Sequence, residues 1–178
     1  MTEAPSVSER IVRHLTQVGE TVACAESLTA GLVSATIADT PGASVVLRGG
    51  IVAYAADVKV ALLGVSASVV AEAGTVDPRV ASAMADGARV RLGATWGIAT
   101  TGVAGPGPAE GKPAGTVHVA VAGPGGTVTR ALRLDGVRGE VRRLAADAAL
   151  ALALEVMTRP AKNGRGSAGP SGQTPETS

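Results

Sequence analysis

The stretch TVACAESLTAG (residues 21–31) decides the fold class, because a short strand is followed there at once by the start of a helix. Residues 21–25 are small or β-branched, which is typical of a buried strand. A helix is predicted from about Leu28 to Ala38, and the breaker cluster Asp-Thr-Pro-Gly at residues 39–42 ends it. A strand followed directly by a helix points to an α/β protein when the pattern repeats along the chain.

The pattern does repeat outward from this stretch. Before it, Ser6 and Glu9 are spaced as a capping box for a helix that Gly19 ends. After it, the predicted elements are a strand over 45–54, a helix over 56–63, a helix with Asp77 as N-cap that ends at Gly93, strands over 96–101, 116–121 and 127–134, and a helix over 137–157. This order predicts a mixed sheet with helices on both faces.

The composition indicates one folded domain with an unusual core. The chain has 178 residues, of which 46% are hydrophobic and only 1% aromatic, with one Trp, one Tyr and no Phe. Since 24 residues are glycine, we expect a core of Ala, Val and Leu joined by tight turns. We place the folded domain at residues 8–158, after a flexible N-terminus over 1–7. Residues 159–178 are predicted to be a disordered tail, because no Val, Ile, Leu, Met or aromatic residue occurs from Pro160 onward.

The same counts exclude several classes of function. One cysteine and two histidines leave no set of Cys or His ligands for a metal site, so neither a metal nor a cofactor is expected. A net charge of +1 and the scarcity of aromatic residues argue against nucleic acid as a partner. No apolar run is long enough to span a membrane, and the first residues do not form a secretory signal. We therefore expect a cytoplasmic protein that binds neither membranes nor nucleic acids.

The ligand site of such a sheet lies at the carboxyl ends of the strands, where three loops are predicted to meet: residues 26–29, 54–59 and 101–112. In the first loop, the Ser27 hydroxyl lies near the free N–H groups at the start of the following helix. Such N–H groups can hold an oxyanion, so Ser27 is a candidate nucleophile. The alternative interpretation is that Ser27 is an ordinary helix N-cap.

A nucleophilic serine needs a base, and the second loop offers Lys59. Tyr54 and Lys59 flank the turn after a predicted strand and can face the same crevice, and a lysine acts as a base when burial lowers its pKa. The alternative for Lys59 is an exposed helix lysine. His14, on a predicted helix, and His118, in a predicted strand, are interpreted as structural residues.

The third loop begins with TTGVAGPG (residues 100–107), a strand end that runs into a glycine-rich turn. Its backbone N–H groups can approach a phosphate or carboxylate closely, although a plain structural turn has the same composition. Neither the dinucleotide-binding GxGxxG pattern nor the Walker pattern is present. Arg138 and Arg142 are four residues apart on one helix face, where they either grip a phosphate or contact solvent.

Several separate motifs occur in a single order: AESLTAGLVSATIADTPGAS (25–44), GGIVAYAADVKVALLGV (49–65), TTGVAGP (100–106), KPAGTVHVAV (112–121) and GVRGEVRRLAADAAL (136–150). In order and spacing they closely resemble the C-terminal domain of the CinA (competence/damage-inducible protein) family, over about Ser8 to Thr158. That family includes stand-alone nicotinamide-mononucleotide deamidases, called PncC. The resemblance implies a three-layer α/β/α sandwich with a mixed central sheet.

The resemblance also implies an activity, the hydrolysis of the carboxamide of nicotinamide mononucleotide to nicotinic acid mononucleotide and ammonia without a metal or cofactor. Ser27 is then the nucleophile and Lys59 the base, with Tyr54 beside it, and helix N–H groups hold the oxyanion. Either Lys59 or Tyr54 protonates the departing ammonia. The substrate phosphate is expected either on the loop over residues 101–107 or near Arg138. The residues implied in substrate contact are Glu26, Thr29, Gly31, Gly50, Thr101, Gly102, Ala104, Gly105, Pro106, Lys112 and Arg138.

Two other functions stay open at this point. One is a catalytically silent nucleotide-binding or regulatory domain, and the other is an amidase for a different small amide. The expected partner is the small-molecule substrate, together with further copies of the chain. A homo-oligomer is predicted because Leu150, Leu154 and Met157 form a second apolar stripe on the last helix.

Overall fold

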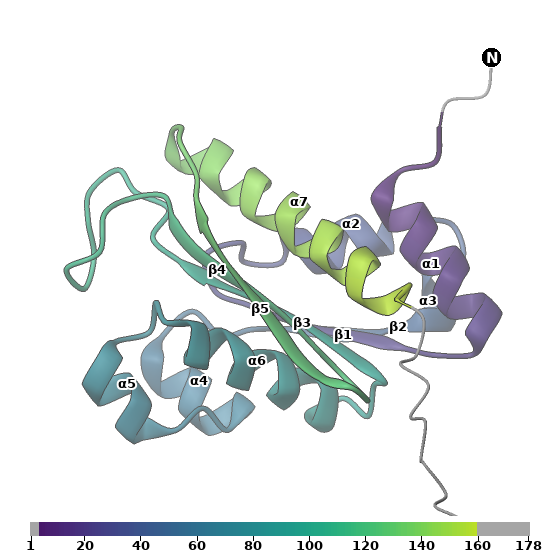
Figure 1. Ribbon diagram of the computed structural model, residues 1–178, viewed down its shortest axis with the longest axis horizontal. Helices are drawn as coiled ribbons and strands as arrows, with labels where there is room; N and C mark the ends of the chain where they lie inside the picture. Colours follow the sequence, from purple (N-terminus) through teal and green to yellow (C-terminus); the bar gives the residue numbers. More distant parts are fainter. Residues whose placement is uncertain (1–3, 160–178) are drawn as a thin grey trace, which may run out of the picture.

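Residues 4–159 are described by the computed structural model, and a five-stranded sheet forms their centre (Figure 1). The strands lie in the order β2-β1-β3-β4-β5. The first three run parallel, and β4 and β5 pair antiparallel to their neighbours, so the predicted mixed sheet is confirmed. The bounds of the strands are Val22–Glu26 for β1, Leu47–Val52 for β2, Trp96–Gly102 for β3, Thr116–Gly123 for β4 and Gly126–Arg133 for β5.

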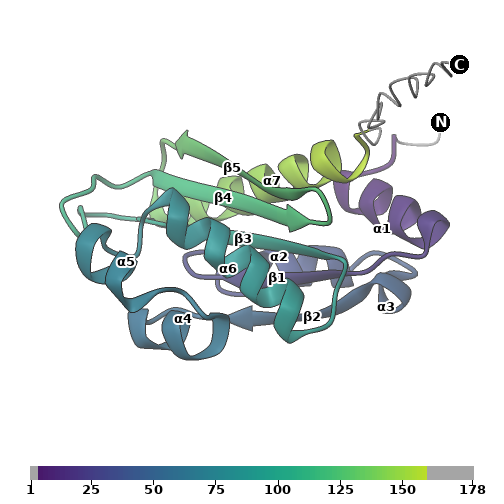
Figure 2. The ribbon, with the colours of Figure 1, turned by 60° about the horizontal axis from the view of Figure 1, so that its bottom comes forward.

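Helices cover both faces of the sheet, which confirms the three-layer α/β/α arrangement. Figure 1 shows α1, α2, α3 and α7 on one side and α4, α5 and α6 on the other, and Figure 2 brings this second group forward. The first group comprises α1 (Val7–Val18), α2 (Leu32–Ala38), α3 (Ala43–Val46) and α7 (Arg138–Met157). The second comprises α4 (Ala56–Leu63), α5 (Ala67–Ala73) and α6 (Pro78–Arg91).

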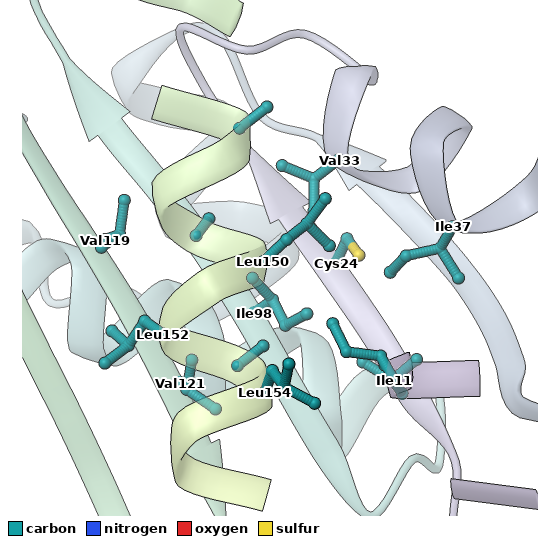
Figure 3. Packing of buried hydrophobic residues seen from close by; sticks show 14 of the residues in the cluster. Ile11, Cys24, Val33, Ile37, Ile98, Val119, Val121, Leu150, Leu152 and Leu154 are labelled. Carbon is teal, nitrogen blue, oxygen red and sulfur yellow. The ribbon is translucent and has the colours of Figure 1, made fainter. Parts of the chain in front are cut away.

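The two faces of the sheet carry side chains of different size. On the side of α7, larger side chains such as Cys24, Ile98 and Val119 pack against Leu152 and its neighbours (Figure 3). On the side of α6, the strand residues are mostly alanines, and they pack against Ala81, Ala85, Ala88 and other small residues. Because side chains alternate along a strand, β1, β3 and β4 each contribute buried side chains to both faces of the sheet. A core without phenylalanine is thus possible because one helix layer lies very close to the sheet.

Two predicted elements differ from the observed ones, and one observed helix was not predicted. The helix expected from Leu28 begins only at Leu32, and the strand expected over 45–54 is a short helix, α3, followed by β2. The β-branched residues 45–46 favoured a strand, but they follow Gly42 in a left-handed conformation, and Val46 is buried in the core beside α1. Helix α5 was missed because it buries none of its residues and so carries no hydrophobic periodicity.

The ends of the folded part are set by α1 and α7. The capping box of Ser6 and Glu9 is confirmed, and since α1 begins at Val7, residues 6–7 belong to the fold and not to the flexible N-terminus predicted over 1–7. Of the predicted tail, Arg159 is described and forms an ion pair with Glu155. Residues 160–178 lie outside the described residues. Among residues 4–159, no helix combines the length and the apolar character needed to cross a membrane.

The apolar stripe that led us to expect a homo-oligomer is part of the core. Leu150, Leu154 and Met157 are buried within the chain itself, in the cluster that α7 forms with α1 and the sheet. This stripe therefore leaves no free apolar surface, and the homo-oligomer stays a prediction without that support.

The order of the strands places a crevice at one end of β1. From β1 the chain passes through α2 and α3 to β2 on one side, and then through α4, α5 and α6 to β3 on the other side. The loop that leaves β1 leads to α2 on one face of the sheet, and the loop that leaves β2 leads to α4 on the other face. Ligands of open α/β sheets bind at this kind of switch point, beyond the carboxyl ends of the strands.

The close approach of α6 to the sheet yields a first prediction. A Cβ atom added to Gly97 in β3 would overlap the carbonyl oxygen of Ala85 in α6, which is backbone and cannot swing away. We expect Gly97→Ala to lower the free energy of unfolding by about 1–3 kcal/mol, the usual cost of overpacking. Chemical denaturation measures this change.

The control is Gly125→Ala in the hairpin between β4 and β5, where an added Cβ meets no atom within 4 Å. Equal stability of the two variants would contradict the proposed close packing of α6 on β3.

Candidate active site

A serine and a buried lysine lie in contact at the carboxyl end of β1. Ser27 directly follows β1, and Lys59 reaches it from α4 on the side of the small residues. The Lys59 Nζ atom is 3.1 Å from the Ser27 Oγ atom, 2.8 Å from the carbonyl oxygen of Ala53 and 2.9 Å from that of Tyr54. Lys59 is only 1% exposed, so the alternative of a solvent-exposed helix lysine is wrong.

The surroundings of Lys59 favour its neutral form. Burial lowers the pKa of this amine, and the nearby negative charge of Glu110 opposes the shift only in part. A neutral amine has two N–H donors, which match the carbonyl oxygens of Ala53 and Tyr54, and one lone pair, which is left for the hydroxyl proton of Ser27. This is the arrangement that a general base requires.

The turn after Ser27 is organised by Glu26, the last residue of β1. Helix α2 has Gly31 at its N-cap position and no capping side chain of its own, so the interpretation of Ser27 as the N-cap is wrong. The Glu26 carboxylate accepts the backbone N–H groups of Gly31, Val33 and Ser34 instead. It also accepts the hydroxyl groups of Ser34 and Thr29. Glu26 therefore supplies acceptors for the first N–H groups of α2. Residues 27–30 form a turn between β1 and this helix.

Two backbone N–H groups in this turn have no hydrogen-bond acceptor. The N–H of Ser27 donates to the Thr100 carbonyl, and that of Ala30 donates to the Ser27 carbonyl. For the N–H groups of Leu28 and Thr29, no acceptor exists among residues 4–159. These two donors lie directly beside the Ser27 hydroxyl in the chain, where an oxyanion would form.

A cavity of about 310 Å³ opens beside Ser27. Leu28 and the glycine-rich loop after β3 form much of its wall, and Tyr54, Thr75, Val76 and Arg138 complete it. At its rim, Arg138 donates from Nη1 to the Gly105 carbonyl at 2.9 Å and from Nη2 to the Tyr54 hydroxyl at 2.8 Å. The Tyr54 phenol thus pairs with Arg138, and only the backbone of Tyr54 contacts Lys59.

The sequence matches the model of one protein family, described as the CinA C-terminal domain, over residues 4–157. The chain belongs to this CinA family. Two relatives named CinA-like protein are similar to this domain, one from Frankia casuarinae at 54% identity and one from Anaeromyxobacter dehalogenans at 50%. The matches cover 78% and 80% of this chain but only 32% and 35% of those proteins. This CinA domain therefore spans about a third of the length of these relatives.

Solved structures of the family share the fold of this CinA domain. The competence/damage inducible protein CihA from Agrobacterium tumefaciens is 33% identical, with a TM-score of 0.79 over 89% of this chain and 100% of that one. A CinA superfamily protein from Klebsiella pneumoniae is 30% identical, with a TM-score of 0.82 over 85% of this chain and 95% of that one. The resemblance read from the motifs is thus confirmed for family and fold.

Part of the predicted substrate-contact set lines the cavity of this CinA domain. These residues are Gly102, Ala104, Gly105, Pro106 and Arg138, next to Ser27 and Tyr54. The two expected phosphate positions, the loop and Arg138, coincide, because Arg138 donates to the carbonyl of Gly105 within the loop.

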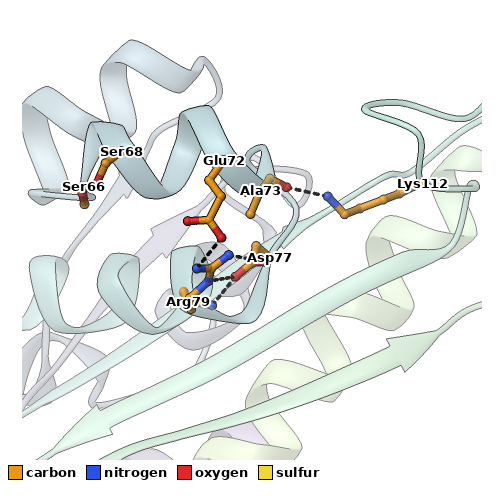
Figure 4. A network of polar contacts seen from close by, with 7 residues as sticks. All are labelled: Ser66, Ser68, Glu72, Ala73, Asp77, Arg79 and Lys112. Carbon is orange, nitrogen blue, oxygen red and sulfur yellow. Dashed lines mark hydrogen bonds and ion pairs between the residues drawn. The ribbon is translucent and has the colours of Figure 1, made fainter.

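The other predicted contact residues of the CinA domain do not line the cavity, and each has contacts within the protein. The side chains of Glu26 and Thr29 are buried and bonded to each other, so Thr29 has only its backbone N–H without an acceptor among residues 4–159, and Gly31 is the N-cap of α2. Gly50 faces the Ser34 side chain, with no room for a Cβ. The remaining two residues, Thr101 and Lys112, bind the backbone of the segment that contains Thr75 of the cavity wall. Thr101 donates to the Thr75 carbonyl, and Lys112 donates to the Ala73 carbonyl, a bond drawn in Figure 4.

One residue at the cavity of the CinA domain was not anticipated from the sequence. Glu110 reaches from the loop after β3 to residues 75–76 and accepts from the Thr75 N–H at 2.7 Å, the Thr75 hydroxyl at 2.8 Å and the Val76 N–H at 3.3 Å. Burial alone would raise the pKa of its carboxyl group, but these hydrogen bonds lower it below its ordinary value. No local pattern signals this contact, because its partners lie 34 and 35 residues away.

His14, His118 and Cys24 are not among the residues that line this cavity of the CinA domain. The Nε2 atom of His14 is 3.0 Å from the Met157 carbonyl oxygen at the end of α7, and His118 lies in β4 opposite Thr101. Cys24 is buried in the core, and burial raises the pKa of its thiol to about 12, so the thiol stays protonated. The structural interpretation of both histidines therefore agrees with their positions.

The role of Glu26 leads to a second prediction. Glu26→Gln replaces one acceptor oxygen by an NH₂ group that faces backbone N–H donors, and it removes the negative charge at the N-terminus of α2. Hydrogen bonds to a charged group contribute about 1.5–3 kcal/mol each, so we expect the free energy of unfolding to fall by about 3 kcal/mol. Urea denaturation measures the loss.

A matched control is Glu72→Gln, because Glu72 makes an exposed ion pair with Arg79 (Figure 4) and such pairs contribute little. If Glu26→Gln and Glu72→Gln have the same stability, Glu26 does not hold the turn.

Proposed function

We propose that this domain is an amidohydrolase that converts nicotinamide mononucleotide and water to nicotinic acid mononucleotide and ammonia. The observation that carries the proposal is the 3.1 Å contact between Ser27 and the buried Lys59 at the wall of a cavity. Membership of the CinA family supports the choice of substrate, because the family resemblance implies this reaction. The side chains named below supply every proton transfer.

The first half of the proposed reaction forms an ester with the enzyme. The Ser27 Oγ atom attacks the carboxamide carbon while its proton passes to the Lys59 Nζ atom. The negative charge that develops on the amide oxygen is held by the N–H groups of Leu28 and Thr29. When the tetrahedral species collapses, the C–N bond breaks, and ammonia leaves with the proton that Lys59 had received.

The second half releases the acid. A water molecule loses a proton to Lys59 and attacks the ester carbon, and the same two N–H groups hold the new oxyanion. The C–O bond to Ser27 then breaks, and the proton returns from Lys59 to the Ser27 oxygen. Lys59 is favoured over Tyr54 for all of these transfers, because the Tyr54 hydroxyl is paired with Arg138.

The rim of the cavity fits a phosphate group. Arg138 is the cationic side chain of the cavity wall, and a guanidinium group suits the geometry of a phosphate. The glycine-rich loop beside it exposes backbone N–H groups of small residues, which allow an anion to approach closely. A nucleotide bound this way directs its phosphate to Arg138 and its carboxamide to Ser27.

The alternative of a catalytically silent domain depends on a misplaced lysine. The contact of Lys59 with Ser27 removes that argument, and no other feature of the described residues favours it. An amidase for a different small amide uses the same side chains, so the substrate assay below includes nicotinamide, nicotinamide riboside and asparagine beside the mononucleotide.

The function is tested by ammonia release from these four amides. We expect turnover with the mononucleotide, a loss of at least ~10³-fold in kcat for Ser27→Ala and a loss of ~10²–10⁴-fold for Lys59→Met. Ser66→Ala is the control, since Ser66 is an exposed serine at the start of α5 whose hydroxyl bonds only to Ser68 among the described residues (Figure 4).

Two results would reject the assignment. If the wild-type protein releases no ammonia from the mononucleotide, the substrate is wrong. If Ser27→Ala retains full activity, the nucleophile is wrong.

The state of Lys59 also predicts a pH dependence. The base acts only when neutral, so kcat/KM falls as the pH drops through the pKa of Lys59. Since burial lowers this pKa, the inflection lies below the pKa of an ordinary lysine. Glu110 raises the pKa of Lys59 by its charge, so Glu110→Gln moves the inflection to still lower pH. A pH–rate profile that is unchanged in Glu110→Gln would contradict this coupling.

A further inference from the structure

The side chain of Arg142 in α7 binds the backbone of the turn that follows Ser27. Its Nε atom donates to the Leu28 carbonyl oxygen at 2.9 Å, and its Nη2 atom donates to the Thr29 carbonyl oxygen at 2.9 Å. Arg142 is half-buried and does not line the cavity, so it neither contacts solvent freely nor grips a phosphate there. Neither expectation for this arginine accounts for its two hydrogen bonds to the serine turn.

We infer that Arg142 is a positioning residue that orients the oxyanion-binding N–H group of Thr29. This inference rests on the proposed function. It adds the interaction that keeps the turn after Ser27 in the conformation that binds the oxyanion.

The geometry follows from the planarity of the peptide bond. In a trans peptide the C=O and N–H groups point in opposite directions, and the peptide between Leu28 and Thr29 is trans. Arg142 draws the Leu28 carbonyl toward α7, on one face of the sheet. The Thr29 N–H therefore points in the opposite direction, away from α7. A rotation of this peptide would break the bond to Arg142.

The charge of Arg142 acts in the same direction. A guanidinium group stays protonated at every pH that a protein tolerates. Bound to a carbonyl oxygen, it polarises the peptide and makes the N–H at the other end a stronger donor, because linked hydrogen bonds reinforce one another. A donor fixed before the reaction needs no reorganisation when the oxyanion forms.

The other arginines of this part of α7 have different surroundings. Arg138, one turn earlier, contacts Gly105 and the Tyr54 hydroxyl at the cavity. Arg143, the next residue, is exposed and has no hydrogen-bond partner among residues 4–159. Arg142 alone of these three binds the serine turn, and Arg143 offers a matched control with the same charge on the same helix.

The experiment compares Arg142→Met, Arg142→Lys and Arg143→Met in two assays on the full chain. The first is the rate at which a small alkyl fluorophosphonate labels Ser27, followed by mass spectrometry. In this reaction the Ser27 oxygen bonds to phosphorus, the P–F bond breaks, fluoride leaves, and Lys59 takes the serine proton. The second is the deamidation of nicotinamide mononucleotide, with kcat and KM measured separately. Thermal melting shows whether each variant is folded.

We expect Arg142→Met to lower both the labelling rate and kcat by ~10²-fold, the cost of losing one oxyanion donor, while KM changes by less than ~3-fold. Arg142→Lys keeps the charge but lacks the planar, preorganised fork of the guanidinium group, so it recovers part of the rate. Arg143→Met matches the wild type in both assays. If Arg142→Met does not fold, Arg142→Lys carries the same comparison.

Labelling of Ser27 at the wild-type rate in Arg142→Met would overturn the inference, as would an effect on KM alone. The two proposals fail separately. A wild-type protein that labels at Ser27 but releases no ammonia from the mononucleotide defeats the proposed substrate, and the labelling rates still decide the role of Arg142.

Discussion

The carboxylate of Glu26 accepts five hydrogen bonds from the turn that follows it and from the start of α2, and the arrangement of the site depends on this one buried group. A helix that begins directly after a strand needs acceptors for its first N–H groups. Glu26 provides them from the last position of β1, so Ser27 is not used as a cap. The serine hydroxyl is thereby left free for Lys59, and two amide groups are left without acceptors.

The small-residue face of the sheet has a related effect at the same place. Alanines and glycines in β1, β3 and α6 let the second helix layer lie close, and α4 packs against α6. Lys59 extends from α4 to the end of β1 and is almost fully buried. A lysine in this position loses its hydration, which lowers its pKa. The scarcity of aromatic residues in the chain is therefore linked to the candidate site, because the close packing of small residues also buries Lys59, the proposed base.

Much of the fold was predictable, and the errors have a common origin. The capping box at Ser6, the N-cap at Asp77 and the alternation of strands and helices are local patterns, and the structure confirms them. Residues 45–46 were assigned to a strand by their β-branched side chains, although the turn at Gly42 and the packing of Val46 against α1 make them helical. Ser27 was singled out and lies at the cavity beside Lys59, but Glu26 was not identified as the residue that caps α2.

The sequence by itself determined the fold class, the family and the residue types available for chemistry, because these follow from patterns within short stretches and from their order. Only the tertiary structure decided which of those residues meet. Lys59 lies 32 residues from Ser27, and Arg142 lies 114 residues from Leu28. No local pattern reports such contacts, because they depend on how the layers pack. Burial, which lowers the pKa of a lysine, likewise depends on the packed layers and not on the lysine's neighbours in the chain.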